Sequence, residues 1–217
     1  MAGVLLAIHD QALPAARFAK LWRKVRAVGD EKLKQTYWTN FWFDFGAPQN
    51  AVDEAALALR EAFGLGWKAA GVEWWLGRTD LRRVPIELHA DRDNRLFDTR
   101  RRLRHPTVSS VLYFNRVKGG ALLVLDQRES RDGSRRVPSE PRDWALAAPR
   151  PNRFVHFPGD RLHAVLDANN AMPSRPLRLP AAPLRWALVL NWWARRPMEV
   201  PAWTGEVYAS LRTRAVR

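Results

Sequence analysis

From Gly71 onward, the chain is a series of short apolar runs, each about as long as a β-strand and each followed by turn-forming residues. Valine, leucine and aromatic side chains dominate the runs, and glycine, proline or aspartate separates them, as at Gly119-Gly120 and residues 158–160. We expect strands at residues 72–77, 84–90, 107–115, 121–127, 153–157, 161–166 and 184–194. Short strands at regular spacing predict a mainly β fold, a double-stranded β-helix of the jelly-roll or cupin-like type.

Residues 1–70 follow a different pattern. Apolar side chains in residues 14–35 and 51–64 recur at helical spacing, and Gly64 ends the second segment. Residues 36–46 are aromatic and extended in character. We expect these elements to flank and support the β core.

The whole chain, residues 1–217, is short enough to be one domain. Its core is expected in residues 72–195. Residues 128–151 and 167–183 lack a strand pattern, so we expect them to be poorly ordered loops.

The composition excludes several kinds of site. The chain has no cysteine, so it forms no disulfide, zinc-thiolate site or thiol nucleophile, and any metal must be held by histidine, aspartate or glutamate. No stretch approaches the roughly 20 apolar residues of a membrane span. The first apolar run has no basic residue before it, which indicates a first strand or helix and no signal peptide. We therefore expect a cytoplasmic protein without a membrane partner.

The net charge of +14 raises the question of an anionic partner. Only six of the 36 basic residues are lysines, and such an arginine excess is typical of a GC-rich genome, which weakens the case for nucleic acid. The densest basic runs are residues 100–104 and 131–136. They fit a solvated surface, an anion-binding patch beside a site, or a nucleic-acid tract.

His89 and Asp91 stand two residues apart at the end of an expected strand, so both side chains face the same way. A pair of this kind also occurs by chance, and its meaning depends on a further ligand. Residues 153–166 read as strand, tight turn and strand, with His156 on the first arm and His163 on the second. A distant histidine joined to His89 and Asp91 makes a facial triad of two histidines and one carboxylate, which favours non-heme Fe(II).

Five motifs in a fixed order carry a resemblance to a known family. They are HAD at 89–91, YFN at 113–115, the Gly-Gly pair, FVHFPGDRLHAV at 154–165 and RWALVLNWW at 185–193. In these the chain resembles the Fe(II)/2-oxoglutarate-dependent dioxygenases, in particular their prolyl-4-hydroxylase-like branch. The resemblance covers about residues 72–195, which would then be the catalytic core.

The resemblance implies roles for named residues. His89, Asp91 and His163 would bind iron, while Arg185 and Tyr113 would bind the distal carboxylate of the cosubstrate 2-oxoglutarate. Arg185 lies 22 residues beyond His163, more than is usual in the family, and Arg178 is the alternative.

Further residues are expected to contact the substrate. Alternation along the last strand places Asn191 on the same face as Arg185. The other expected contacts follow the HAD motif or end a core strand: Arg92, Asp93, Arg95 and Asp126.

The activity implied by the resemblance is oxidation of a C–H bond, usually hydroxylation, with Fe(II), 2-oxoglutarate and O2. We expect a small-molecule substrate such as an amino acid or a specialised-metabolite intermediate, and the arginines around the motif favour an anionic one. Hydroxylation of a peptide or protein side chain is the alternative within the class. A cupin-type metal enzyme without 2-oxoglutarate, a non-catalytic jelly-roll module and a nucleic-acid-binding protein are the alternatives outside it. The sequence carries no signal for oligomeric state.

Overall fold

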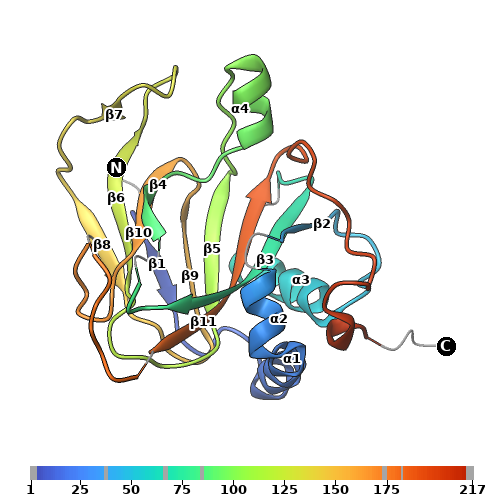
Figure 1. Cartoon of the computed structure of the whole chain (residues 1–217). Helices are drawn as coiled ribbons and strands as arrows, with labels where there is room; N and C mark the ends of the chain where they lie inside the picture. Colours follow the sequence, from blue (N-terminus) through green and yellow to red (C-terminus); the bar gives the residue numbers. More distant parts are fainter. Residues whose placement is uncertain are drawn as a thin grey trace.

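Two antiparallel β-sheets face each other in the computed structural model of the chain (Figure 1). The structure describes residues 4–36, 39–65, 68–83, 86–172, 175–181 and 183–213. The larger sheet has six strands in the order β1 (Ala7–His9), β9 (Arg153–Pro158), β5 (Val108–Tyr113), β11 (Leu184–Trp193), β3 (Gly71–Asp80) and β2 (Phe41–Phe43). The smaller sheet runs β4 (Ile86–His89), β10 (Arg161–Val165), β6 (Leu122–Glu129) and β7 (Arg136–Val137), and β8 (Trp144–Ala147) also pairs with β6. The expected double-sheet, jelly-roll-like core is confirmed.

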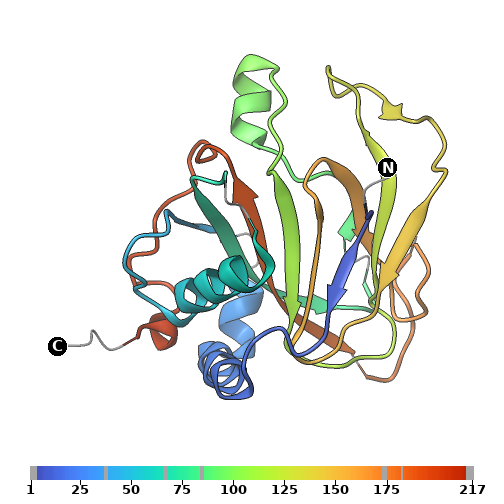
Figure 2. The same ribbon diagram turned by 180° about the vertical axis from the view of Figure 1, so that it is seen from behind.

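Helices cover the outer face of the larger sheet. α1 (Ala15–Val28), α2 (Asp30–Gln35) and α3 (Ala51–Phe63) lie on that face, and Figure 2 shows α1 and α3 on the side turned away from the smaller sheet. α3 is well delimited, because the Asn50 side chain accepts from the backbone N–H groups at its start and Gly64 ends it with left-handed backbone. α1 and α2 are separated at Gly29, whose φ is 88°. The expected supporting helices are thus present, together with a short final 3-10 helix, η1 (Ala209–Leu211).

Alternation along the strands of the larger sheet divides its side chains between two cores. One face of β5 and β11 packs on α1 and α3, with Leu112, Leu188 and Trp192 fully buried. The opposite face packs on the smaller sheet, with Val111 and Tyr113 among the buried residues. Side chains on this second face point between the sheets, which is where a site would lie.

The structure corrects one expectation about irregular segments and adds a helix that was not expected. Residues 128–151 were expected to be a poorly ordered loop, but they contain β7 and β8, both paired with β6. The arginine-rich stretch after Asp93 contains a fourth helix, α4 (Asn94–Arg100). Few apolar residues mark β7 or α4, because each stands at the rim of the fold and buries little surface (Figure 1). β8 is apolar but only four residues long. No helix in the described ranges is both long and apolar enough to cross a membrane.

The Gly-Gly pair before β6 is required by backbone geometry. Gly119 and Gly120 have φ values of 76° and 68°, in the region that glycine favours. A Cβ atom on Gly119 would lie 2.4 Å from the carbonyl oxygen of Ala168, and one on Gly120 would lie 2.6 Å from Leu81. The pair therefore lets the chain turn tightly against the segment that follows β10.

We expect Gly119→Ala to destabilise the fold by more than the roughly 1–2 kcal/mol that left-handed backbone costs an alanine, because the clash is with backbone and cannot relax. Urea unfolding measures the difference. Gly64→Ala is the matched control: its φ of 60° is also positive, but nothing lies within 4 Å of the added Cβ. An equal loss in the two variants would contradict this account of Gly119.

Candidate metal centre and cavity

His89 and His163 are register partners on the neighbouring strands β4 and β10. Opposite residues of an antiparallel pair share a face, and the ring centroids of the two imidazoles are 4.3 Å apart. Asp91 follows β4, with Oδ1 3.9 Å from His89 Nε2 and Oδ2 3.6 Å from His163 Nε2. The three ligand atoms lie within 4.8 Å of one another, close enough to bind one ion.

Both imidazoles are held with Nε2 toward this point. His89 Nδ1 is 2.8 Å from the carbonyl oxygen of Glu87, and His163 Nδ1 is 3.0 Å from that of Arg161. A carbonyl oxygen only accepts, so Nδ1 donates in each ring and the neutral imidazole keeps a lone pair on Nε2. Burial lowers the pKa of His163, which favours the neutral form that metal binding needs. Two imidazoles and one carboxylate are a donor set that suits a divalent transition metal.

Asp91 is anchored by a residue that the sequence analysis missed. Ser109 Oγ, on β5 of the larger sheet, donates to Asp91 Oδ2 at 2.7 Å. His105 Nδ1 also donates, to the backbone carbonyl of Asp91 at 2.7 Å, so His105 helps to hold the segment that carries this ligand. The only signal for Ser109 in the sequence is a pair of serines, Ser109 and Ser110, within a largely apolar strand, and the sequence does not say which of the two reaches Asp91.

We expect Ser109→Ala to weaken binding of a divalent metal such as Co(II) by about 10- to 100-fold, because the carboxylate loses the donor that orients it. Calorimetric titration measures the affinity. Ser110→Ala is the matched control, since Ser110 is equally buried but bonds to Leu190 and Trp192 on the other face of β5. A similar loss of affinity in both variants would show that the effect is one of folding.

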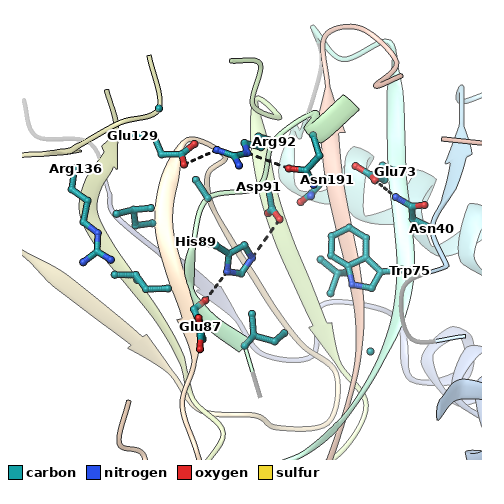
Figure 3. A pocket seen from close by; sticks show the side chains of 18 of the residues that line it. Asn40, Glu73, Trp75, Glu87, His89, Asp91, Arg92, Glu129, Arg136 and Asn191 are labelled. Atoms are coloured by element: carbon teal, nitrogen blue, oxygen red, sulfur yellow. Dashed lines mark hydrogen bonds and ion pairs between the residues drawn. The ribbon is translucent and has the colours of Figure 1, made fainter. Parts of the chain in front are cut away.

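A cavity of about 880 Å³ is lined by two of the three ligands, His89 and Asp91. Figure 3 shows its wall of side chains from the larger sheet, with His89 and Asp91 near the middle. Residues of one face of β3 and β11 line it, namely Glu73, Trp75, Gly77, Thr79, Arg185, Val189 and Asn191. The period-2 expectation that Arg185 and Asn191 share a face is therefore confirmed.

Arg185 is the unusual charge in this wall. It is 3% exposed, its Nε has no hydrogen-bond partner, and no carboxylate in the described ranges lies within ion-pair distance of it. Its guanidinium carbon lies 4.9 Å from the ring centroid of Tyr113, whose buried hydroxyl also lacks a partner. A buried guanidinium is stabilised by a paired anion. Because Arg185 lines the cavity, a ligand bound there can supply that anion.

Thr79, opposite Arg185 on β3, also lines the cavity. The sequence analysis missed this hydroxyl. Arg178, the alternative to Arg185, is exposed and does not line the cavity.

Of the five residues expected to contact the substrate, two line the cavity. Asn191 and Arg92 line the cavity, and Arg92 Nη1 is held by Glu129 at 2.9 Å. Asp93 does not line it: its buried carboxylate begins α4 by accepting from Leu96 N–H at 3.0 Å. Asp93 therefore has a structural task, and the expectation of substrate contact is not supported.

Arg95 and Asp126 also lie outside the cavity lining. Arg95 is exposed and pairs with Glu199, and Asp126 accepts from the backbone N–H of Arg142 at 3.1 Å. Both are explained by these local contacts.

Two other histidines, His9 and His156, pair with each other and are not among the three ligands. His9 Nε2 and His156 Nε2 are 3.1 Å apart, and the His9 ring stacks on Phe63. His156 is thus the satisfied histidine of the two arms, and His163 is the one that faces Asp91.

Comparison with known proteins gives a likeness of fold only. No protein-family model matches the chain, and no curated protein matches it in sequence. Among solved structures it is similar to a prolyl-4-hydroxylase of Pseudomonas putida, with 21% identity, coverage of 88% of this chain and 85% of that one, and a TM-score of 0.46. It is also similar to a 2OG-Fe(II) oxygenase family oxidoreductase of Burkholderia pseudomallei (14% identity, 91% and 88% covered, TM-score 0.48). A third is a prolyl hydroxylase from Trichoplax adhaerens (12% identity, 87% and 83% covered, TM-score 0.49).

Proposed function

We propose that the protein is an Fe(II)- and 2-oxoglutarate-dependent oxygenase that hydroxylates a C–H bond of a small substrate. The observation that carries this proposal is the convergence of His89 Nε2, His163 Nε2 and an Asp91 oxygen on one point, with both rings fixed through Nδ1. Three ligands of this type cover one face of an octahedron and leave positions free for other molecules. Two of the three ligands, His89 and Asp91, line the cavity, from which such molecules could reach the metal.

The residues present also fit 2-oxoglutarate. Arg185 supplies a buried guanidinium without an anion, and it lies over the ring of Tyr113, whose hydroxyl has no partner. Together they would hold the distal carboxylate, and Thr79 would contribute a hydroxyl. When bound, iron and 2-oxoglutarate would activate O2 for attack on a C–H bond, with release of succinate and CO2.

The protein's own contribution would be to position the metal ligands and to exclude water from part of the cavity. Ser109 holds the Asp91 carboxylate in place, and the apolar side chains Val189, Leu88 and Leu162 line the cavity and keep water from part of it. The cavity volume of about 880 Å³ is in the range typical of small-molecule sites.

The arginines that line the cavity favour a substrate with a carboxylate or phosphate, as an amino acid has. Arg135 and Arg136 also line the cavity, on the segment that contains β7, and Figure 3 labels Arg136. No acid in the described ranges pairs with either side chain. Substrate contacts by Arg92 and Asn191 belong to the same proposal.

The test is spectroscopic and needs no knowledge of the substrate. Under anaerobic conditions, addition of Fe(II) and 2-oxoglutarate to the folded protein is expected to give a visible charge-transfer band, which neither addition gives alone. Succinate formation in air then reports turnover. A folded protein that binds the metal but gives no band with 2-oxoglutarate would support a cupin-type metal enzyme instead.

A further inference from the structure

Glu73 is a buried acid on the cavity wall without a cation. It is 8% exposed and lies on β3, where Figure 3 shows it pointing toward Asn40. Its carboxylate accepts from Trp193 Nε1 at 2.9 Å and from the Asn40 side-chain amide, and both donors are neutral. Across the described ranges, no lysine, arginine or histidine forms an ion pair with it.

The surroundings of Glu73 have opposing effects on the ionisation of its carboxyl group. Donors to both oxygens favour the carboxylate, whereas burial, with the nearby charge of Asp91 as a further cause, raises the pKa of Glu73 to about 7. A buried carboxylate is strongly stabilised only when a cation pairs with it. Because Glu73 borders open space in the cavity, a ligand can bring that cation.

Asn191 adds a second acceptor beside it. It is the register partner of Glu73 on β11, so the two side chains stand next to each other on the same face. Asn191 is 2% exposed, lines the cavity, and its Oδ1 has no hydrogen-bond partner. A buried oxygen in this state calls for a donor, and the cavity is where a ligand's donor would stand.

Trp75 completes the arrangement with an aromatic surface. It follows Glu73 by two residues on β3, therefore shares its face, and also lines the cavity. Figure 3 shows its indole ring next to the Glu73 and Asn40 pair. An indole face attracts cations, so carboxylate, amide oxygen and ring all favour the same kind of group.

We propose that Glu73, Asn191 and Trp75 form a subsite for an ammonium group, so that the substrate carries a protonated amine. The inference rests on the proposed function, because the metal centre marks the end of the cavity where the C–H bond reacts. Ser109, Asn191 and Glu73 lie in one row across β5, β11 and β3. At the usual strand spacing, Glu73 is about 10 Å from Ser109, the residue that holds Asp91. The oxidised carbon is then separated from the nitrogen by only a few bonds.

The first experiment varies the ligand and leaves the protein unchanged. Saturation-transfer NMR is recorded with the protein amino acids, short alkylamines and the N-acetyl derivative of each, with and without Fe(II) and 2-oxoglutarate under anaerobic conditions. Acetylation removes the positive charge of the amine and keeps the rest of the molecule. We expect binding of one or more free amines and loss of that binding, by about 10-fold or more, in the acetylated partners.

The second experiment varies the subsite. Glu73→Gln is expected to weaken binding of the same amine by about 10- to 100-fold and to leave the charge-transfer band with Fe(II) and 2-oxoglutarate unchanged. Glu140→Gln is the control. It removes the same charge from an exposed residue that does not line the cavity. A glutamine amide at position 73 faces the Trp193 N–H and can disturb folding, so Asn191→Ala is a second variant with the same expected direction.

The outcomes separate this inference from the proposed function. Equal binding of free and acetylated ligands, unchanged binding in both subsite variants, or no binding of any amine would each overturn the ammonium subsite. The charge-transfer band decides the oxygenase proposal independently, because it is measured without substrate. A wild-type protein that shows the band but no preference for amines keeps the first proposal and loses the second.

Discussion

Replacing Asp91 with alanine is expected to abolish succinate formation from 2-oxoglutarate while the protein stays folded. Asp91 is the only acid among the three converging ligands, and without it two neutral imidazoles face the site. Loss of a residue that merely orients a ligand costs roughly 10- to 100-fold in metal affinity or activity, so loss of the ligand itself should cost more. His89→Ala and His163→Ala are expected to behave alike. Succinate is measured with saturating Fe(II), and circular dichroism reports the fold.

A matched control for these variants is His156→Ala. His156 is a partly buried histidine on β9, paired with His9 and absent from the cavity lining. Its replacement is expected to leave succinate formation close to the wild-type rate. Turnover retained in Asp91→Ala, or lost equally in His156→Ala, would show that the ligand set is wrong.

The second large effect is expected at Arg185. In Arg185→Gln the distal carboxylate of 2-oxoglutarate loses a buried guanidinium, and truncation of one partner of a buried charge pair costs about 2–5 kcal/mol. The KM for 2-oxoglutarate should therefore rise by roughly 30-fold to several thousand-fold. Binding of Fe(II) without cosubstrate should be unchanged, since Arg185 is not among the metal ligands. Steady-state kinetics and metal titration measure the two quantities.

Arg178→Gln removes the same charge from an exposed position outside the cavity lining. Its KM for 2-oxoglutarate is expected to match that of the wild type. A raised KM in Arg178→Gln with a normal value in Arg185→Gln would transfer the role to Arg178. Normal values in both would argue against an arginine-held carboxylate.

The parts of the site that follow from strand periodicity could be predicted from the sequence. Alternation alone places Arg185 and Asn191 on one face of β11, and the cavity lining confirms it. The spacing of His89 and Asp91 likewise predicts side chains that face the same way, and the structure shows their ligand atoms close together.

Other residues depend on contacts between distant segments, which periodicity does not report. Ser109 donates a hydrogen bond to Asp91 between the two sheets. Glu73 accepts one from Trp193, which is distant from it in sequence. Asp93 was expected to contact substrate because it follows the HAD motif. Its side chain caps α4, which is again a contact that strand periodicity does not report.

The short β7 and β8 strands and α4 were missed for a related reason. β7 and α4 stand at the rim, where few side chains are buried, so their sequences carry little apolar pattern. β8 is apolar, but it is only four residues long and its Trp144 and Leu146 are exposed. β7 and α4 contain arginines, and Arg136 of β7 and Asn94 of α4 line the cavity. Residues 84–85, part of the strand expected at 84–90, lie outside the described residues.

The hydrogen bond between Ser109 and Asp91 joins the two sheets at the metal centre. His89 and His163 belong to strands of the smaller sheet, whereas Ser109 belongs to the larger one. β4 is an edge strand, held in its sheet only by β10 among the described strands. The hydrogen bond from Ser109 to Asp91 therefore connects the edge of the smaller sheet to the larger sheet. The distance between the two sheets and the affinity for the metal are then coupled. A mutation that changes how the sheets pack far from the ligands should therefore also change the metal affinity.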